Sequence, residues 1–132
     1  MAANYAMPGF EIRVKDGILE LRTDGERTEE NGQDTERAFG SLVAHAQPDA
    51  LLFDVREATY TLSPSRWKER AAVVARMTRD YPLAIVIRDD QLVLNNEVIT
   101  RLREMGGTGK TFTTRTEARA WLLEQIRVKA GS

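Results

Sequence analysis

The sequence contains no cysteine and a single histidine among its 132 residues. Without cysteine the chain can form neither a disulfide nor a thiolate metal site, and it offers no thiol nucleophile. Because His45 is the sole imidazole, a nucleophile–base pair could be assembled only from that residue and a serine or threonine elsewhere. Stability must therefore come from packing, and the sequence singles out no catalytic set.

The chain also lacks an excess of charge and a long apolar run. Its 19 Lys and Arg residues stand against 20 Asp and Glu residues, so no overall field favours nucleic acid or an anionic membrane. The longest apolar runs, such as Leu83–Ile87, are far shorter than the roughly twenty residues that span a bilayer. The start, MAANYAMPGF, has neither the basic nor the apolar region of a signal peptide. We therefore expect a cytoplasmic protein that binds no nucleic acid and spans no membrane.

The length of the chain sets its expected organisation. A chain of 132 residues is near the usual size of one domain. No repeat, low-complexity tract or linker divides it. We expect a flexible N-terminal lead-in over residues 1–9, one domain over residues 10–127 and a short C-terminal tail over residues 128–132.

The first periodic segment predicts a β-hairpin. Over residues 10–15 apolar residues alternate with charged ones, which is the pattern of a half-buried strand. Asp16-Gly17 supplies the residue types of a two-residue primed turn, and a second strand begins at Ile18. After Asp24-Gly25 the sequence becomes polar and acidic, until an apolar helical face begins at Ala38.

Strand-like and helical segments alternate after the hairpin. The runs Ala50–Val55 and Leu83–Ile87 are almost continuously apolar, as in strands covered on both faces. Ser63-Pro64 indicates an N-cap followed by proline at the first helical position. The remaining segments are helices within residues 38–46, 64–81, 95–105 and 116–126 and a brief strand over residues 110–113. This order predicts an α/β fold in which alternating βα units follow the hairpin, with a mostly parallel sheet of about five strands and about four helices.

The stretch MGGTGKT, residues 105–111, resembles the loop that holds the phosphates of a nucleotide. That loop requires Gly-x-x-x-x-Gly-Lys-[Ser/Thr], and the position of its first glycine is occupied by Glu104. The loop must also join a strand to a helix, whose positive end helps to hold the phosphates, whereas here a helix precedes and a strand follows. We therefore interpret Gly106-Gly107 as the end of a helix and expect no nucleotide or other cofactor.

Three aspartates follow the two apolar strands. Asp54 closes the first strand, and Asp89 and Asp90 follow the second, so all three are expected along one rim of the sheet. A shared metal or acid–base site at this rim is the basis for an enzyme interpretation. Aspartates at strand ends more often bond loop amides or cap helices, so we expect neither an enzyme nor a metal site.

Two aromatic residues lie near the predicted helix start. Tyr60 falls in the predicted loop Glu57–Ser63, where an aromatic side chain could line a pocket or an interface. Trp67 lies one turn into the following helix, on an apolar stripe that favours packing in the core.

The order of elements, together with LLFDV (residues 51–55) leading through Thr59-Tyr60 to Ser63-Pro64-Ser65, resembles the STAS family of sulfate transporter and anti-sigma-factor antagonist domains. The closing stretch FTTRTEARAWL, residues 112–122, is similar to the end of the SpoIIAA-like branch, whose fold is shared with CRAL-TRIO lipid-binding domains. The resemblance spans about residues 10–127 and consists more of hydrophobic patterns than of fixed residues. It implies a non-enzymatic module that works through protein interaction.

In the phosphoswitch members of that family, a serine at the start of the helix after the central strand is phosphorylated, and the added charge expels a partner kinase. The interval from Asp54 places the modified position on Pro64, with Ser63 and Ser65 on either side. The resemblance thus implies Ser63 and Ser65 as phosphorylation candidates, although an N-cap role accounts for Ser63 without modification.

Two hypotheses from different classes follow. The leading one is a STAS-like regulatory module that binds an unidentified protein partner. Its predicted partner surface consists of Asp54, Tyr60, Ser63, Ser65 and Trp67. The alternative is a small-ligand or lipid-binding domain of the CRAL-TRIO type, which requires an apolar cavity near Tyr60 and Trp67. A homodimer is compatible with either hypothesis.

Overall fold

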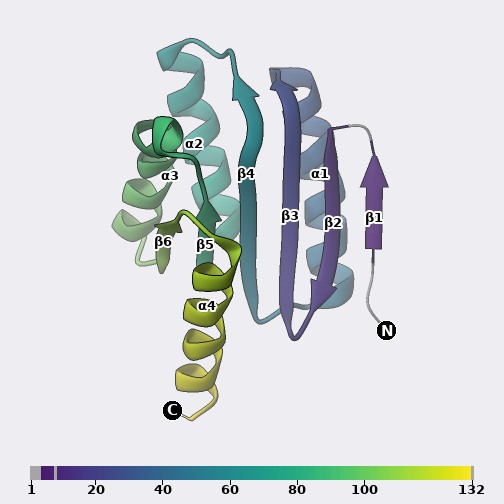
Figure 1. Cartoon of the computed structure of the whole chain (residues 1–132), viewed down its shortest axis with the longest axis vertical. Coiled ribbons are helices and arrows are strands. Elements are labelled where there is room, and N and C mark those ends of the chain that lie inside the picture. The colour runs from purple at the N-terminus through teal and green to yellow at the C-terminus, as the bar shows by residue number, and fades with distance from the viewer. Residues whose placement is uncertain (1–3, 8, 132) are drawn as a thin grey trace.

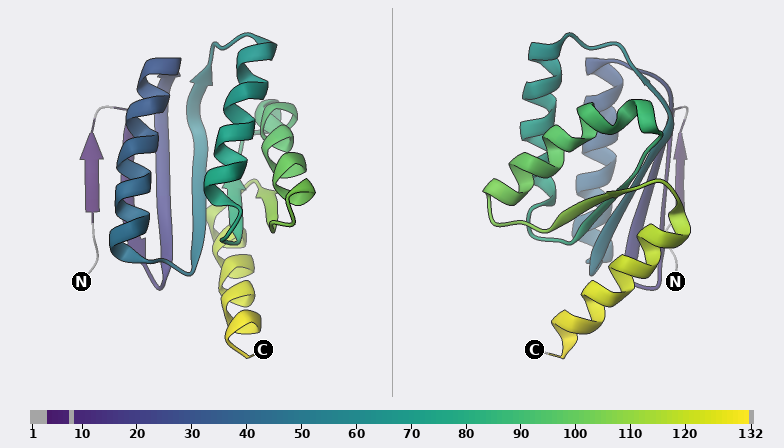
Figure 2. Two further views of the ribbon diagram at one scale, coloured as in Figure 1. Left: turned by 180° about the vertical axis from the view of Figure 1, so that it is seen from behind. Right: turned by 60° about the vertical axis from the view of Figure 1, so that its left-hand side comes forward.

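The computed structural model describes residues 4–7 and 9–131, which form one sheet with helices on both of its faces (Figures 1 and 2). The strands are β1 (Asn4–Met7), β2 (Phe10–Lys15), β3 (Ile18–Arg27), β4 (Ala50–Tyr60), β5 (Leu83–Val86) and β6 (Gly109–Phe112). The helices are α1 (Glu29–Ala46), α2 (Pro64–Thr78), α3 (Leu92–Glu104) and α4 (Arg115–Ala130), with a short 3-10 helix, η1 (Asp89–Gln91), before α3.

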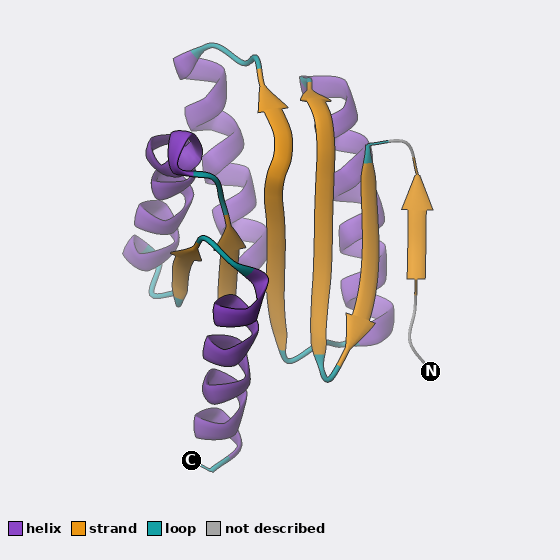
Figure 3. Ribbon diagram, in the orientation of Figure 1, coloured by secondary structure: helices purple, strands orange, loops and turns teal. Residues whose placement is uncertain are grey.

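The sheet has six strands in chain order (Figure 3). Strands β3 to β6 are parallel neighbours, whereas β1 and β2 are antiparallel to the strands beside them. This confirms the predicted α/β arrangement of a hairpin followed by alternating βα units. The strand beyond the expected number is β1, which lies within residues 1–9, where a flexible lead-in was expected.

The hairpin of β2 and β3 forms at the predicted turn. Asp16 (φ 56°) and Gly17 (φ 78°) both have the left-handed conformation that a primed turn requires. β3 then continues to Arg27. Pairing with β4 carries the strand past Gly25 into the segment where the sequence becomes polar and acidic.

The two faces of the sheet carry cores of different size. On one face α1, α2 and α3 cover the larger core (Figure 2), which includes Leu21, Phe39 and Phe53. The ring of Phe39 from α1 meets that of Phe53 edge-on, with centroids 5.4 Å apart. On the other face α4 covers a smaller core around Leu52 and Leu122. Helices therefore cover both faces of the sheet with apolar side chains. For this reason β5, which lies between β4 and β6, is buried along its whole length.

An extra residue in β4 changes the face that its later side chains meet. Arg22 of β3 pairs with Asp54, but Asp24 pairs with Glu57, so β4 has two residues where β3 has one. Because side chains alternate along a strand, one extra residue moves every later side chain to the opposite face. Asp54 consequently faces α4, whereas Tyr60 packs against the larger core. Tyr60 is the last residue of β4, and its predicted position in a loop was wrong.

Local capping residues fix the helix starts. Ser63 accepts a hydrogen bond from the Arg66 amide at 3.4 Å, and Pro64 is the first residue of α2, as predicted. At the start of α1, Thr28 and Asn31 cap each other's amides through their side chains. This reciprocal cap satisfies two amides that the helix itself leaves unpaired.

The MGGTGKT stretch ends α3 and leads into β6, as predicted. Gly106 has a φ of 83°. Its N–H donates to the carbonyl of Arg103 at 3.0 Å, while the N–H of Gly107 donates to that of Leu102 at 2.9 Å. This pair of bonds is the Schellman motif that closes many helices. A Cβ on Gly107 would lie 2.6 Å from Leu102 Cδ1, so the second glycine also permits close packing.

We predict opposite effects for two glycine-to-alanine substitutions. In Gly106→Ala the new side chain meets no atom within 4 Å, but the residue is held at positive φ, which costs about 1–2 kcal/mol of unfolding free energy. Gly40→Ala also meets no atom within 4 Å, and its site inside α1 should gain about 0.5–1 kcal/mol. Urea unfolding of both variants checks this, and a stabilised Gly106→Ala would contradict the assignment of the helix end.

Candidate functional site

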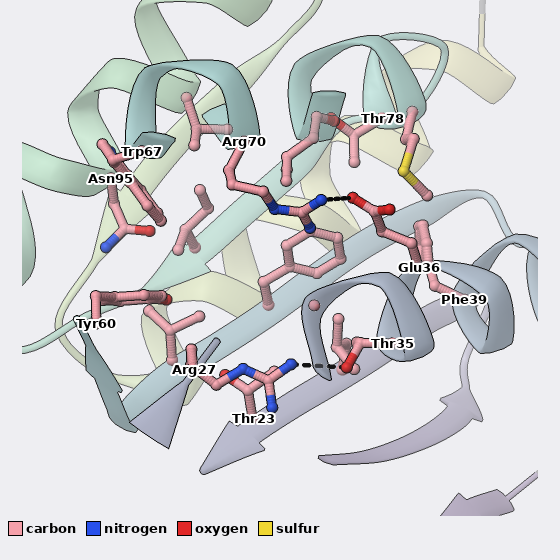
Figure 4. A pocket seen from close by; sticks show the side chains of 18 of the residues that line it. Thr23, Arg27, Thr35, Glu36, Phe39, Tyr60, Trp67, Arg70, Thr78 and Asn95 are labelled. Atoms are coloured by element: carbon pink, nitrogen blue, oxygen red, sulfur yellow. Dashed lines mark hydrogen bonds and ion pairs between the residues drawn. The ribbon is translucent and has the colours of Figure 1, made fainter. Parts of the chain in front are cut away.

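A pocket of about 120 Å³ lies between α1, α2 and the sheet (Figure 4). Its apolar floor includes Leu21, Phe53 and Ile85 of the sheet together with side chains of the two helices. Its polar lining includes Thr23, Arg27, Thr35, Glu36, Tyr60 and Arg70. A concave, mainly apolar surface with a few polar groups is the usual form of a small-ligand site.

Tyr60 and Trp67 line the pocket together. Their ring centroids are 4.8 Å apart at an interplanar angle of 57°. The indole Nε1–H of Trp67 donates to the backbone carbonyl of Leu94 at 2.8 Å, which joins α2 to the first turn of α3. Burial raises the pKa of the Tyr60 hydroxyl above its ordinary value, although the charges of Arg27 and Arg88 oppose this shift. The phenol is therefore neutral at physiological pH. The cavity that the ligand-binding alternative requires near these two residues is present.

Arg27 places a buried positive charge at the pocket. The residue is 7% exposed, and its guanidinium donates to the carbonyl of Gly9 at 3.0 Å and to Thr35 Oγ1 at 2.7 Å. Burial lowers the pKa of Arg27, with Tyr60 and Asp24 opposing that effect and Arg70 adding to it, but a guanidinium keeps its charge in proteins. Within the described part of the chain, Arg27 forms no ion pair with a carboxylate.

A second arginine at the pocket is neutralised. Arg70 of α2 forms an ion pair with Glu36 of α1, and this contact joins the two helices beside the pocket (Figure 4). Gly32 of α1 makes room for it, because a Cβ at that position would lie 3.1 Å from the Arg70 guanidinium. Among the described residues that line the pocket, Arg27 is therefore the charged side chain without an ion-pair partner, and Asp24 acts on its charge only from beyond ion-pair distance.

The two candidate serines lie outside the pocket. Ser63 and Ser65 are both exposed at the start of α2, and their hydroxyl oxygens are 3.4 Å apart. Ser63 Oγ caps the helix, while Pro64 between them contributes no amide hydrogen. The predicted partner surface therefore combined residues from two separate places. Ser63 and Ser65 lie on the outer surface, whereas Tyr60 and Trp67 line the pocket.

Asp54 is not part of either group, because it lies on the opposite face of the sheet. Its carboxylate accepts hydrogen bonds from Arg56 at 2.8 Å and from Arg115 of α4 at 3.0 Å. Arg115 also forms an ion pair at 3.2 Å with the buried carboxylate of Glu20, to which Arg119 of α4 binds as well. Asp54 therefore belongs to a network of arginines and carboxylates that attaches α4 to the sheet.

The suggested rim site of three aspartates does not form. Asp54 binds the α4 arginine network, whereas Asp90 pairs with Arg88 at 3.0 Å and Asp89 lies exposed in η1. Among the described residues, no group of three or more His, Asp or Glu side chains is arranged to hold a metal ion. In the same part of the chain, no helix combines the length and hydropathy that crossing a membrane requires.

Sequence reasoning missed Arg27 and Thr23 as pocket residues. Both continue the alternation that places Leu21 on the pocket face of β3. Extending that period-2 pattern through Gly25 would have found them. The change to a polar, acidic sequence after Asp24-Gly25 hid this alternation.

Two solved structures match nearly the whole chain. A crystal structure of an anti-sigma factor antagonist from Mycobacterium paratuberculosis is 19% identical, with a TM-score of 0.60, covering 92% of this chain and 94% of that chain. An uncharacterized protein from the DUF3478 family with a SpoIIAA-like fold, from Shewanella loihica PV-4, is 16% identical, with a TM-score of 0.58 and coverages of 92% and 95%. No family model and no curated protein matches the sequence. The chain has the SpoIIAA-like fold that the sequence resemblance implied.

The arginine network predicts a specific response to acid. Burial alone would raise the pKa of Asp54, but hydrogen bonds from Arg56 and the charges of Arg56 and Arg115 outweigh it, so the pKa is lowered. A lowered pKa stabilises the fold above the unfolded pKa, and this contribution disappears as the pH falls through the folded pKa. We expect Asp54→Asn to cost about 1–3 kcal/mol at neutral pH, and the difference from the native protein to close as the pH falls below about 4.

Chemical denaturation of the two proteins across this pH range measures the effect. Asp89→Asn, which alters an exposed carboxylate, serves as the control and should follow the native curve throughout. A difference between Asp54→Asn and the native protein that stays constant down to low pH would contradict the proposed ion pairs.

Proposed function

We propose that this protein is a non-enzymatic regulatory module that acts in the cytoplasm by binding a protein partner at the start of α2. The observation that carries the proposal is the fold likeness to an anti-sigma factor antagonist over 92% of the chain. In this proposal phosphorylation changes the charge of an exposed surface, and the affinity of the partner for that surface depends on the charge.

The start of α2 suits such a role because it combines exposure with a defined backbone. Residues 63–66 are all exposed, while the Ser63 cap and Pro64 hold the first turn in one conformation. A preformed surface binds a partner with less loss of conformational entropy than a disordered one. The exposed turn is thus available for contact without unfolding.

Apolar side chains near this turn extend the proposed surface. Leu92 and Val93, at the start of α3, are 47% and 84% exposed. The hydrogen bond from Trp67 to the Leu94 carbonyl fixes this part of α3 against α2. Exposed apolar residues beside a polar turn resemble the composition of a protein interface, where an apolar centre is surrounded by a polar rim.

Phosphorylation at the start of α2 is the proposed control, with Ser65 as the better acceptor. The first turn of α2 contains no acidic residue, so a phosphate there would meet the positive end of the helix without a carboxylate from that turn. Ser63 Oγ already serves as the N-cap, whereas Ser65 is the second residue of α2, directly after Pro64. Modification of Ser65 would therefore add charge to the surface and leave the cap in place.

Site-specific photo-crosslinking in the source cell tests the proposed surface. A benzoylphenylalanine at the exposed Lys68, one turn after Ser65, should form an adduct with a specific protein. The same group at the exposed Ser41 of α1 should not form it. Adding Ser65→Glu should reduce the Lys68 adduct about tenfold, because the new charge alters the surface that the partner contacts.

Two results would count against the proposal. Equal adducts at positions 41 and 68 would show that the contact is not specific for the start of α2. A Lys68 adduct that is unchanged by both Ser65→Glu and Ser63→Glu would show that charge at this turn does not control the partner.

A further inference from the structure

The pocket between α1 and α2 contains a buried charge that forms no ion pair with a carboxylate among the described residues. Of the charged side chains that line it, Arg70 is paired with Glu36, which leaves the Arg27 guanidinium. Arg27 donates to two neutral oxygens, those of Gly9 and Thr35. A buried cation normally has an anionic partner, because desolvating a charge costs more free energy than neutral hydrogen bonds return.

A second polar group in the same pocket lacks a partner. Thr23 is 6% exposed, and its Oγ1 is fully buried without a hydrogen bond in the described part of the chain. Buried hydroxyls are nearly always hydrogen-bonded, so one without a partner calls for an explanation. Figure 4 shows Thr23 beside Arg27 at the pocket, on β3. A hydroxyl and a guanidinium are the donors that carboxylate and phosphate oxygens accept.

The rest of the pocket suits a small apolar body. The aromatic rings of Phe39, Phe53, Tyr60 and Trp67 contribute to its lining together with aliphatic side chains. A volume of about 120 Å³ is comparable with apolar cavities that hold one benzene-sized molecule. Apolar groups and anion-binding donors therefore face the same small space.

We propose that this pocket binds a small amphipathic anion, whose apolar body fills the floor and whose carboxylate or phosphate contacts Arg27 and Thr23. The ligand supplies the negative charge that Arg27 lacks and the hydrogen-bond acceptor that Thr23 lacks. This site lies inside the α1–α2 pocket and is distinct from the proposed partner surface at the exposed start of α2, so each can be tested without the other.

Isothermal titration of the full chain with hexanoate, hexyl phosphate and hexanol tests the proposal. The three probes share an apolar chain and differ in their headgroup. We expect the preferred anion to bind at least about tenfold more tightly than hexanol, since a charge-assisted hydrogen bond contributes that much. Comparison of hexanoate with hexyl phosphate then identifies whether the site takes a carboxylate or a phosphate.

Three variants locate the binding site. Arg27→Met should remove the preference for the anion over hexanol. Thr23→Val should weaken binding of the anion at least about tenfold while hexanol binding stays unchanged, because a hydrogen bond to a charged acceptor is lost. Arg76→Met, an exposed arginine on α2, is the matched control and should bind all three probes as the native protein does.

Thr23→Val keeps the test decisive if Arg27→Met fails to fold, because Thr23 Oγ1 has no partner to lose within the described residues. The proposal is overturned if the native protein binds neither anion, or binds them no more tightly than hexanol. It is also overturned if folded Arg27→Met keeps the native preference for the anion, or if folded Thr23→Val binds the anion as tightly as the native protein does.

Discussion

The extra residue in β4 is the constraint on which the candidate site depends. Side chains along a strand alternate between faces, so one inserted residue exchanges the two faces for the rest of the strand. Before the bulge, Asp54 faces α4 and joins its arginines. After it, Tyr60 faces the helices on the other side, packs on Trp67 and closes one side of the pocket. Without the bulge, Tyr60 would lie on the face that carries Asp54, and the pocket would lose this aromatic wall.

The two faces of the sheet differ in whether their buried charges form ion pairs. On the α4 face, Glu20 and Asp54 are buried carboxylates, and Arg115 binds both of them, so charges of opposite sign satisfy each other. Such a network attaches a helix whose apolar contact with the sheet is small. On the other face, no carboxylate in the described part of the chain forms an ion pair with the buried Arg27. The ion pairs on the α4 face therefore stabilise the fold, whereas the Arg27 guanidinium is suited to binding a ligand.

Features with a local cause could be predicted from the sequence, and those that depend on distant strands could not. Ser63-Pro64 starts a helix and Gly106-Gly107 ends one because capping involves only neighbouring residues. The direction of Tyr60 depends on how β4 pairs with β3, which no local pattern contains. For the same reason the predicted surface grouped Asp54 with residues on the opposite face. The burial of Arg27 without a carboxylate likewise follows from the packing of α1 on the sheet.

The central claim is that the functional face of the sheet is the one under α1 and α2, while the α4 face is structural. The two tryptophans report on these faces separately, since Trp67 lines the pocket and Trp121 of α4 packs against Phe112 of β6. The most direct measurement is therefore the nuclear magnetic resonance spectrum of the two indole N–H groups during titration with hexanoate or hexyl phosphate. The account predicts that the Trp67 signal moves and the Trp121 signal stays. Movement of the Trp121 signal alone, or of neither signal, would contradict it.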